Sequence, residues 1–209
     1  MVISRLVILV ALICRTAFAG PVVLYNNFGP GDTYDVQPGI TFGCGAFCWQ
    51  NPGLTLAFAF TPSSTAAFTE LEMVAGFGMH PANILASIRS DSGGLPGAVL
   101  ESFSTPLTWP PTRLQFNSIL QPTLAAGMQY WVVAAVPDPV NDMGSWSINS
   151  IGANGPQAGK IGDGPWTGSR TNIDAVFRVT GDDSSVPEPS ALALLVLGLA
   201  GILGLRRAA

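Results

Sequence analysis

The sequence predicts an all-β fold: a single β-sandwich or jelly-roll-like domain, flanked by an N-terminal signal helix and a C-terminal transmembrane helix. Gly (24) and Pro (17) are abundant among 209 residues, and charged residues make up only 11%, which is typical of short strands joined by turns. Between residues 20 and 186, apolar runs recur at short intervals, without an apolar stripe of helical period longer than two turns. The expected parts are a signal peptide, the β domain, a linker with its motif, a membrane helix and a basic tail, at residues 1–19, 20–181, 182–189, 190–205 and 206–209.

The N-terminus has the three regions of a secretory signal peptide. Arg5 supplies a positive charge, Leu6 to Ile13 form an apolar run, and Ala17-Phe18-Ala19 is a cleavage site of small-residue type before Gly20. The apolar run is too short to span a bilayer. We therefore expect an exported protein.

The first clear strand pattern is "TLAFAFT", residues 55–61. Leu56, Phe58 and Phe60 fall on one face and Ala57 and Ala59 on the other, a period of two that predicts a strand packed on a core.

The next run, "FTELEMVAGF", alternates in its first half. Phe68, Glu70 and Glu72 are expected on one face, which we interpret as the solvated one, opposite Leu71 and Met73.

A hairpin and several further strands follow. The turn "SGGLPG" separates "NILASIRSD" from "AVLESFS", which predicts two antiparallel neighbours. "MQYWVVAAV" is apolar on both faces and predicts a central strand. A two-layer sandwich would bury Phe58, Phe60, Trp131 and Phe177 together. The remaining strands are expected within residues 112–120, 144–149 and 174–180.

The charge of the domain limits its partners. Between residues 20 and 186 the chain has twelve acidic and five basic residues. Nucleic acid and anionic membrane surfaces are unlikely partners, because both attract clustered Lys and Arg.

Two cysteines, Cys44 and Cys48, remain after the signal peptide. An even pair in an exported chain predicts a disulfide that closes a small loop. The alternative, half of a tetrahedral metal site, lacks ligands because His80 is the one histidine.

The sequence offers little for catalysis, so we expect no enzyme. His80 precedes a proline and no G-x-S-x-G elbow is present, which disfavours a Ser-His-Asp triad. Glu70, Glu72 and Glu101 are the candidates for the paired carboxylates of a glycan hydrolase, which is the second alternative function.

No cofactor is expected, with a structural calcium ion as the open alternative. Asp32 and Asp35 lie in one turn-rich stretch, and Asp138, Asn141 and Asp142 in another. Neither stretch has the spacing of a calcium loop, and Asp and Asn are common in turns for their geometry.

Three tryptophans beside Gly, Pro or Ser suggest sugar binding. Trp109, Trp146 and Trp166 fall in expected loops or strand ends, where an exposed indole could stack on a sugar ring. A carbohydrate-binding module acting on exopolysaccharide is therefore the first alternative function. Caps over the open ends of the sandwich are the other interpretation of these residues.

The C-terminal segment reads "VPEPSALALLVLGLAGILGLRRAA". The run from Ala191 to Leu205 has no charge, and Arg206 and Arg207 follow as a stop-transfer signal. This order predicts a membrane helix with the β domain on the far side of the inner membrane. Fifteen residues are slightly short for a bilayer core of about 30 Å, which thin bilayers and flanking residues can accommodate.

Two parts of the chain resemble known families. "YNNFGPGDTYD", "SDSGGLPGAVLESF", "GMQYWVVAAVPD" and "AVFRVTG", within residues 24–181, resemble the exported choice-of-anchor domains (R type), which implies a β-sandwich and no established activity. Pro187-Glu188-Pro189, the apolar run and the Arg tail resemble the PEP-CTERM sorting signal of Gram-negative bacteria. That resemblance implies recognition by an exosortase, a membrane-embedded cysteine enzyme, processing near the Pro-Glu-Pro motif, and association with exopolysaccharide or biofilm matrix. The chain is therefore expected to be a non-enzymatic protein of the cell surface or matrix.

Overall fold

The computed structural model describes residues 20–43, 53–78, 82–139, 141–169 and 174–182. The predicted signal peptide, the cysteine pair and the C-terminal segment lie outside these ranges. The described residues form thirteen strands and one short 3-10 helix, and none of their helices is long and apolar enough to cross a membrane. The predicted all-β fold is confirmed.

The strands form one antiparallel sheet that we divide into two layers. The first layer consists of β1 (Pro21–Asn26), β2 (Tyr34–Gly43), β4 (Ala66–Phe77), β7 (Thr112–Asn117), β8 (Thr123–Leu124), β10 (Met143–Asn149) and β13 (Phe177–Asp182). The second layer consists of β3 (Leu54–Phe60), β5 (Asn83–Asp91), β6 (Pro96–Pro106), β9 (Tyr130–Ala135), β11 (Gln157–Ile161) and β12 (Thr167–Ser169). The 3-10 helix η1 (Pro30–Asp32) lies between β1 and β2.

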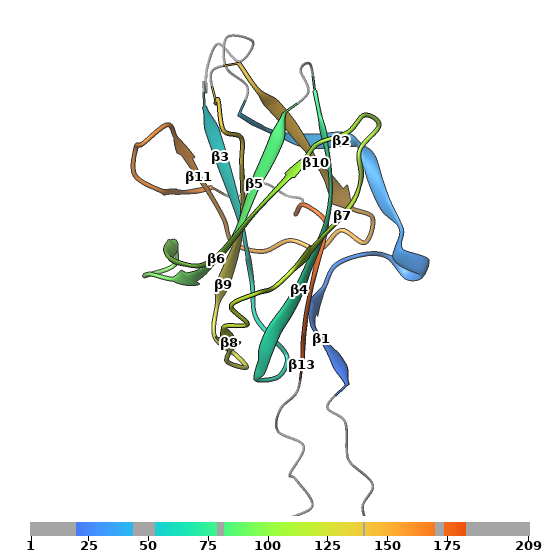
Figure 1. Ribbon diagram of the computed structural model, residues 1–209, viewed down its shortest axis with the longest axis vertical. Helices are drawn as coiled ribbons and strands as arrows, with labels where there is room; N and C mark the ends of the chain where they lie inside the picture. Colours follow the sequence, from blue (N-terminus) through green and yellow to red (C-terminus); the bar gives the residue numbers. More distant parts are fainter. Residues whose placement is uncertain (1–19, 44–52, 79–81, 140, 170–173, 183–209) are drawn as a thin grey trace, which may run out of the picture. The chain divides into compact units, whose positions relative to one another are not determined.

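The long strand β4 organises the first layer. It pairs directly with four strands, which are β13, β10, β7 and β8. In the second layer, β9 lies between β3 and β5, β6 extends one side, and β11 and β12 extend the other (Figure 1). A single residue pair, Gly43 and Leu54, joins β2 to β3, so the sheet can fold over at this point.

The inner faces of the two layers share one hydrophobic core. Phe58 of β3 meets Trp146 of β10 with ring centroids 5.1 Å apart, and Phe60 meets Phe177 of β13 at 6.0 Å. All four side chains are at most 2% exposed. Edge-to-face rings at these distances stabilise the packing beyond the burial of their area. The domain is therefore sandwich-like, as predicted.

Several strands match their predicted patterns. Phe58 and Phe60 lie in the shared core, whereas Ala57 and Ala59 belong to a separate cluster on the outer face of the second layer. The predicted hairpin is β5 and β6, and "MQYWVVAAV" contains β9, which pairs on both edges as a central strand should.

The alternation expected at the start of β4 is wrong because of a β-bulge. Glu70 pairs with Thr180 and Phe68 with Gly181, so Thr69 is an extra residue on β4. A bulge shifts the side-chain alternation by one position. Phe68 consequently lies in the shared core with Leu71 and Met73, rather than opposite them.

The expected burial of Trp131 beside Phe58, Phe60 and Phe177 is also wrong. Trp131 is buried, but in the outer cluster of Ala57, Ala59, Val133 and Ala158. Its Nε1 donates to Asp91 Oδ1 at 2.8 Å, which satisfies the indole N–H away from the main core.

Candidate functional site

The three tryptophans proposed for sugar binding lie in different surroundings. Trp109 follows β6 in the loop to β7, and its side chain is 58% exposed. The peptide bond from Trp109 to Pro110 is cis, and Phe77 N donates to Thr108 O at 3.3 Å, tying the loop to β4. The exposed indole thus lies on a loop that a backbone hydrogen bond joins to β4.

Trp146 is not a sugar platform, which corrects the sequence prediction. Its side chain is 0% exposed, and its Nε1 donates to Val176 O at 2.9 Å. The residue packs between the layers against Phe58 and Phe177. Glycine and serine neighbours suggested a loop, but "GSWSIN" is part of β10 and alternates inward at the tryptophan.

Trp166 is half-buried on the outer face of the second layer. It packs against the outer cluster around Trp131, and two cations lie over its ring: the Arg89 guanidinium at 5.9 Å and Lys160 Nζ at 5.6 Å from the centroid. The contact with Arg89 of β5 attracts the hairpin of β11 and β12 to the sheet, whereas Lys160 belongs to β11 and its contact lies within the hairpin. Arg89 and Lys160 were not predicted as partners of Trp166, because no sequence pattern indicates these contacts.

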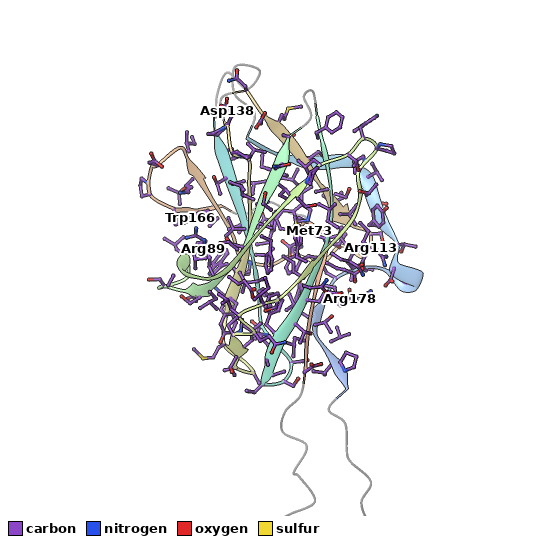
Figure 2. All side chains as sticks on the ribbon, in the orientation of Figure 1. Met73, Arg89, Arg113, Asp138, Trp166 and Arg178 are labelled. Atoms are coloured by element: carbon purple, nitrogen blue, oxygen red, sulfur yellow. The ribbon has the colours of Figure 1, made fainter. Side chains whose placement is uncertain are left out.

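Trp109 and Trp166 occupy separate surfaces. Trp109 lies beside β4 at the β6–β7 loop, whereas Trp166 lies over β3 and β9. Figure 2 shows Trp166 next to Arg89, on the opposite side of the domain from Arg113 and Arg178. The predicted aromatic residues are therefore not brought together in one site.

A cluster of four charges lies on the first layer. Arg178 Nη1 is 3.0 Å from Glu72 Oε2, and Arg113 Nη1 is 3.3 Å from Glu72 Oε1. Arg113 Nη1 also lies 3.1 Å from Asp32 Oδ2, and Arg178 contacts Asp32 Oδ1. Both guanidiniums lie over the Phe28 ring, at 5.1 Å and 4.9 Å from its centroid. Two carboxylates and two guanidiniums thus neutralise one another; we call these four residues the ion cluster.

The ion cluster corrects the expectation that Glu72 faces solvent. The Glu72 side chain is only 5% exposed, with the guanidiniums of Arg113 and Arg178 against its two carboxylate oxygens. The hydrogen bond from Arg178 lowers the pKa of Asp32. Burial, followed by the charge of Glu72, raises the pKa of neighbouring Glu70.

Glu101, the third candidate carboxylate, has a structural environment. It is 5% exposed and accepts hydrogen bonds from Ile119 N at 2.6 Å and Leu120 N at 3.1 Å, together with Ser118 Oγ. Its carboxylate therefore links β6 to the turn after β7 by hydrogen bonds. Neither Glu72 nor Glu101 has a free oxygen directed into an open cleft.

Some of the calcium candidates have other partners among the described residues. Asp32 is engaged by two arginines, and Asn141 Nδ2 donates to Asp138 Oδ2 at 2.7 Å within its own turn. The described part of the chain has no group of three or more His, Cys, Asp or Glu side chains that could hold a metal ion. Cys44, Cys48 and His80 lie outside it.

An apolar cavity of about 480 Å³ lies beside β3 and β11. Its lining comes largely from aliphatic and aromatic side chains of β2, β3 and β11, among them Ile40, Leu54, Leu56, Phe58 and Ile161. Sequence patterns did not predict this cavity, because its lining combines β2 and β3 with β11, which is distant from them in the sequence.

Comparisons with known proteins bear on the C-terminal segment. Residues 185–208 match the PEP-CTERM protein-sorting motif, which includes Pro187, Glu188, Pro189 and the two arginines Arg206 and Arg207. No curated protein matches the chain significantly, and the choice-of-anchor resemblance stays a prediction. Residues 185–208 therefore carry the PEP-CTERM protein-sorting motif, which supports exosortase-dependent sorting of an exported protein and implies membrane-associated sorting in a Gram-negative bacterium.

Proposed function

We propose that this chain is a non-enzymatic protein of the cell surface or extracellular matrix, delivered by its C-terminal signal. The observation that carries the proposal is the match of residues 185–208 to the PEP-CTERM motif, which joins a Pro-Glu-Pro motif, an uncharged apolar run and a basic end in this order. The apolar run holds the chain in the inner membrane with the β domain outside. The exosortase then processes the chain near Pro187–Pro189.

The environment of the candidate carboxylates supports a non-enzymatic role. A glycan hydrolase needs two carboxyl groups on either side of an open substrate site. Glu72 is bound by Arg113 and Arg178, and Glu101 by the turn at residues 118–120. Both groups stabilise the fold where they lie.

The proposal is tested by following the chain through cell fractions of its native host. Pro187→Ala and Glu188→Ala, singly and together, are compared with Ser184→Ala, which lies in the linker just outside the matched motif. We expect the motif variants to accumulate in the inner membrane, while the wild type and Ser184→Ala reach the surface or medium. Equal distribution of all five chains would contradict the proposal.

Carbohydrate binding is the second candidate function, and the exposure of Trp109 favours it. A 58% exposed indole on a loop tied to β4 offers a flat apolar face to a sugar ring. The probe is the host's purified exopolysaccharide. Loss of the stacking contact in Trp109→Ala is expected to weaken binding by about five- to tenfold. Ile151→Ala, a change at another exposed apolar residue, should leave binding unchanged. Equal binding by both variants would exclude Trp109 as the platform.

A further inference from the structure

The chain enters and leaves the β domain at the same end. Pro21, the first residue of β1, pairs with Asp182, the last residue of β13. Eight residues separate Asp182 from Ala191, where the apolar run begins, and even fully extended they reach only about 30 Å. While residues 191–205 are held in a bilayer, this end of the domain stays close to its surface.

This end of the domain consists of the outer ends of β1 and β13 and of two loops beside them. Asp182 pairs with Ala67, which also pairs with Thr123 of β8. Gly127 N donates to Pro62 O at 3.0 Å, which joins the two loops. Figure 1 shows β8 in the lower part of the domain, with the outer ends of β1 and β13. We call residues 61–65 and 118–128 the tether end.

The tether end exposes large apolar side chains. Ile119 is 89%, Leu120 69% and Met128 58% exposed, although aliphatic residues of this size are usually buried. The first two are held in place, because their backbone N–H groups donate to the buried carboxylate of Glu101. The buried carboxylate of Glu101 thus holds a turn from which two branched aliphatic side chains extend into solvent.

The tether end also lacks charge. Residues 61–65 and 118–128 contain no Asp, Glu, Lys, Arg or His, and Asp182 is the charged residue of the paired strand ends. An uncharged apolar tip can enter the interface of a bilayer through burial of aliphatic surface alone. It does not require anionic lipids, which the acidic domain would repel.

We propose that the tether end docks the β domain onto a neutral lipid surface during the membrane stage of sorting, with Ile119 and Leu120 inserted among the head groups. This inference rests on the proposed function, because the C-terminal segment brings the domain to the bilayer. Docking holds the domain against the membrane and so limits the orientations in which the Pro-Glu-Pro motif is presented.

The test uses the full chain in phosphatidylcholine vesicles, with a protease recognition sequence in place of residues 183–186. Vesicles are floated before and after cleavage, and the fraction of the β domain that floats is measured. We expect the cleaved wild-type domain to remain bound, and I119S/L120S to reduce the ratio of bound to free domain about tenfold. High salt should leave binding unchanged, since charge does not contribute.

The matched control is L85S/V99S, which changes two exposed apolar residues of β5 and β6, 39% and 48% exposed. It should float as the wild type does, and equal melting temperatures establish that both double variants are folded. Complete release of the wild-type domain after cleavage, or equal release of both variants, would overturn the inference. So would a dimer of the cleaved domain in light scattering that I119S/L120S abolishes without lipid binding in the wild type. A full chain that does not float even before cleavage would instead contradict the proposed function, and this inference with it.

Discussion

Glu70 and Glu72 lie two residues apart on β4, yet their surroundings differ. Glu72 is 5% exposed and bound by two guanidiniums, whereas Glu70 has its pKa raised by burial and by the charge of Glu72. Glu72 is in direct contact with two guanidiniums, whereas at Glu70 the charge of Arg178 only partly offsets the two effects that raise its pKa. The difference arises from Arg113 and Arg178, which come from β7 and β13 on either side of β4.

Removing Glu72 should destabilise the domain more than removing Glu70. Glu72→Ala leaves two guanidiniums close together with only the more exposed Asp32 as a shared partner, and we expect a loss of about 2 kcal/mol in the free energy of unfolding. This is less than the roughly 3–5 kcal/mol of a fully buried pair, because the arginines are partly exposed. Glu70→Ala should change stability by less than about 0.5 kcal/mol. Denaturant unfolding of both variants measures the difference, and equal losses would contradict the role assigned to the ion cluster.

Asp174 predicts a pH dependence of stability. Burial raises its pKa above the ordinary value of 3.8, against hydrogen bonds from Gln157 and Gly155. The folded state therefore keeps this proton at pH values where the unfolded state has lost it. The stability that Asp174 contributes is present below about pH 4 and is lost as pH rises through the folded pKa.

Asp174→Asn should remove this dependence. The free energy of unfolding of the wild type, relative to the variant, is expected to fall as the pH rises above about 4 and through the raised pKa of Asp174. Asp32 acts in the opposite direction, because its pKa is lowered, and its effect lies below pH 3.8. Unfolding curves at a series of pH values measure the difference, and a constant gap between the two proteins would contradict the assignment.

At the scale of elements, the hairpin of β11 and β12 has few means of attachment. β11 pairs with β3 along one edge, and β12 pairs within the described residues with β11 alone. Trp166 adds a contact on the outer face, where it packs against the cluster around Trp131 and lies under Arg89 and Lys160. The indole therefore fastens the hairpin to the second layer.

Trp166→Ala should loosen this hairpin before it affects the rest of the domain. Loss of the indole packing and of the cation–π contact with Arg89 of β5 is expected to lower the local opening free energy by about 1–2 kcal/mol. Amide hydrogen exchange in Gln157–Ile161 would then be faster by about tenfold. Trp109→Ala, a change at an exposed indole on another loop, is the control and should leave this exchange unchanged. Unaltered exchange in Trp166→Ala would contradict the fastening role.

Strand patterns in the sequence were informative where they were regular. "TLAFAFT" and the β5–β6 hairpin follow simple rules of alternation and turn composition, and both are confirmed. The bulge at Thr69 could not be predicted, because it depends on the register with β13, more than a hundred residues further along the chain. Trp131 and Trp146 were misplaced for a related reason: apolar or small neighbours do not identify which face of a two-layer sheet receives the side chain.

At the scale of the molecule, the C-terminal segment and the β domain differ in how far the sequence predicts them. The C-terminal segment could be read from the sequence, since motif, apolar run and arginines are local and ordered, and residues 185–208 match the sorting motif. The domain's own surfaces arise from long-range contacts. The ion cluster joins residues from η1, β4, β7 and β13, and the tether end combines two loops that are distant in sequence.

We propose that the C-terminal segment is a signal processed by an exosortase. The decisive measurement is mass spectrometry of the mature protein, isolated from the surface or medium of its native host. We expect a C-terminal peptide that ends near Pro187–Pro189, without the apolar run from Ala191 to Leu205. A mature protein that ends at Ala209, with unchanged localisation in Pro187→Ala, would contradict it.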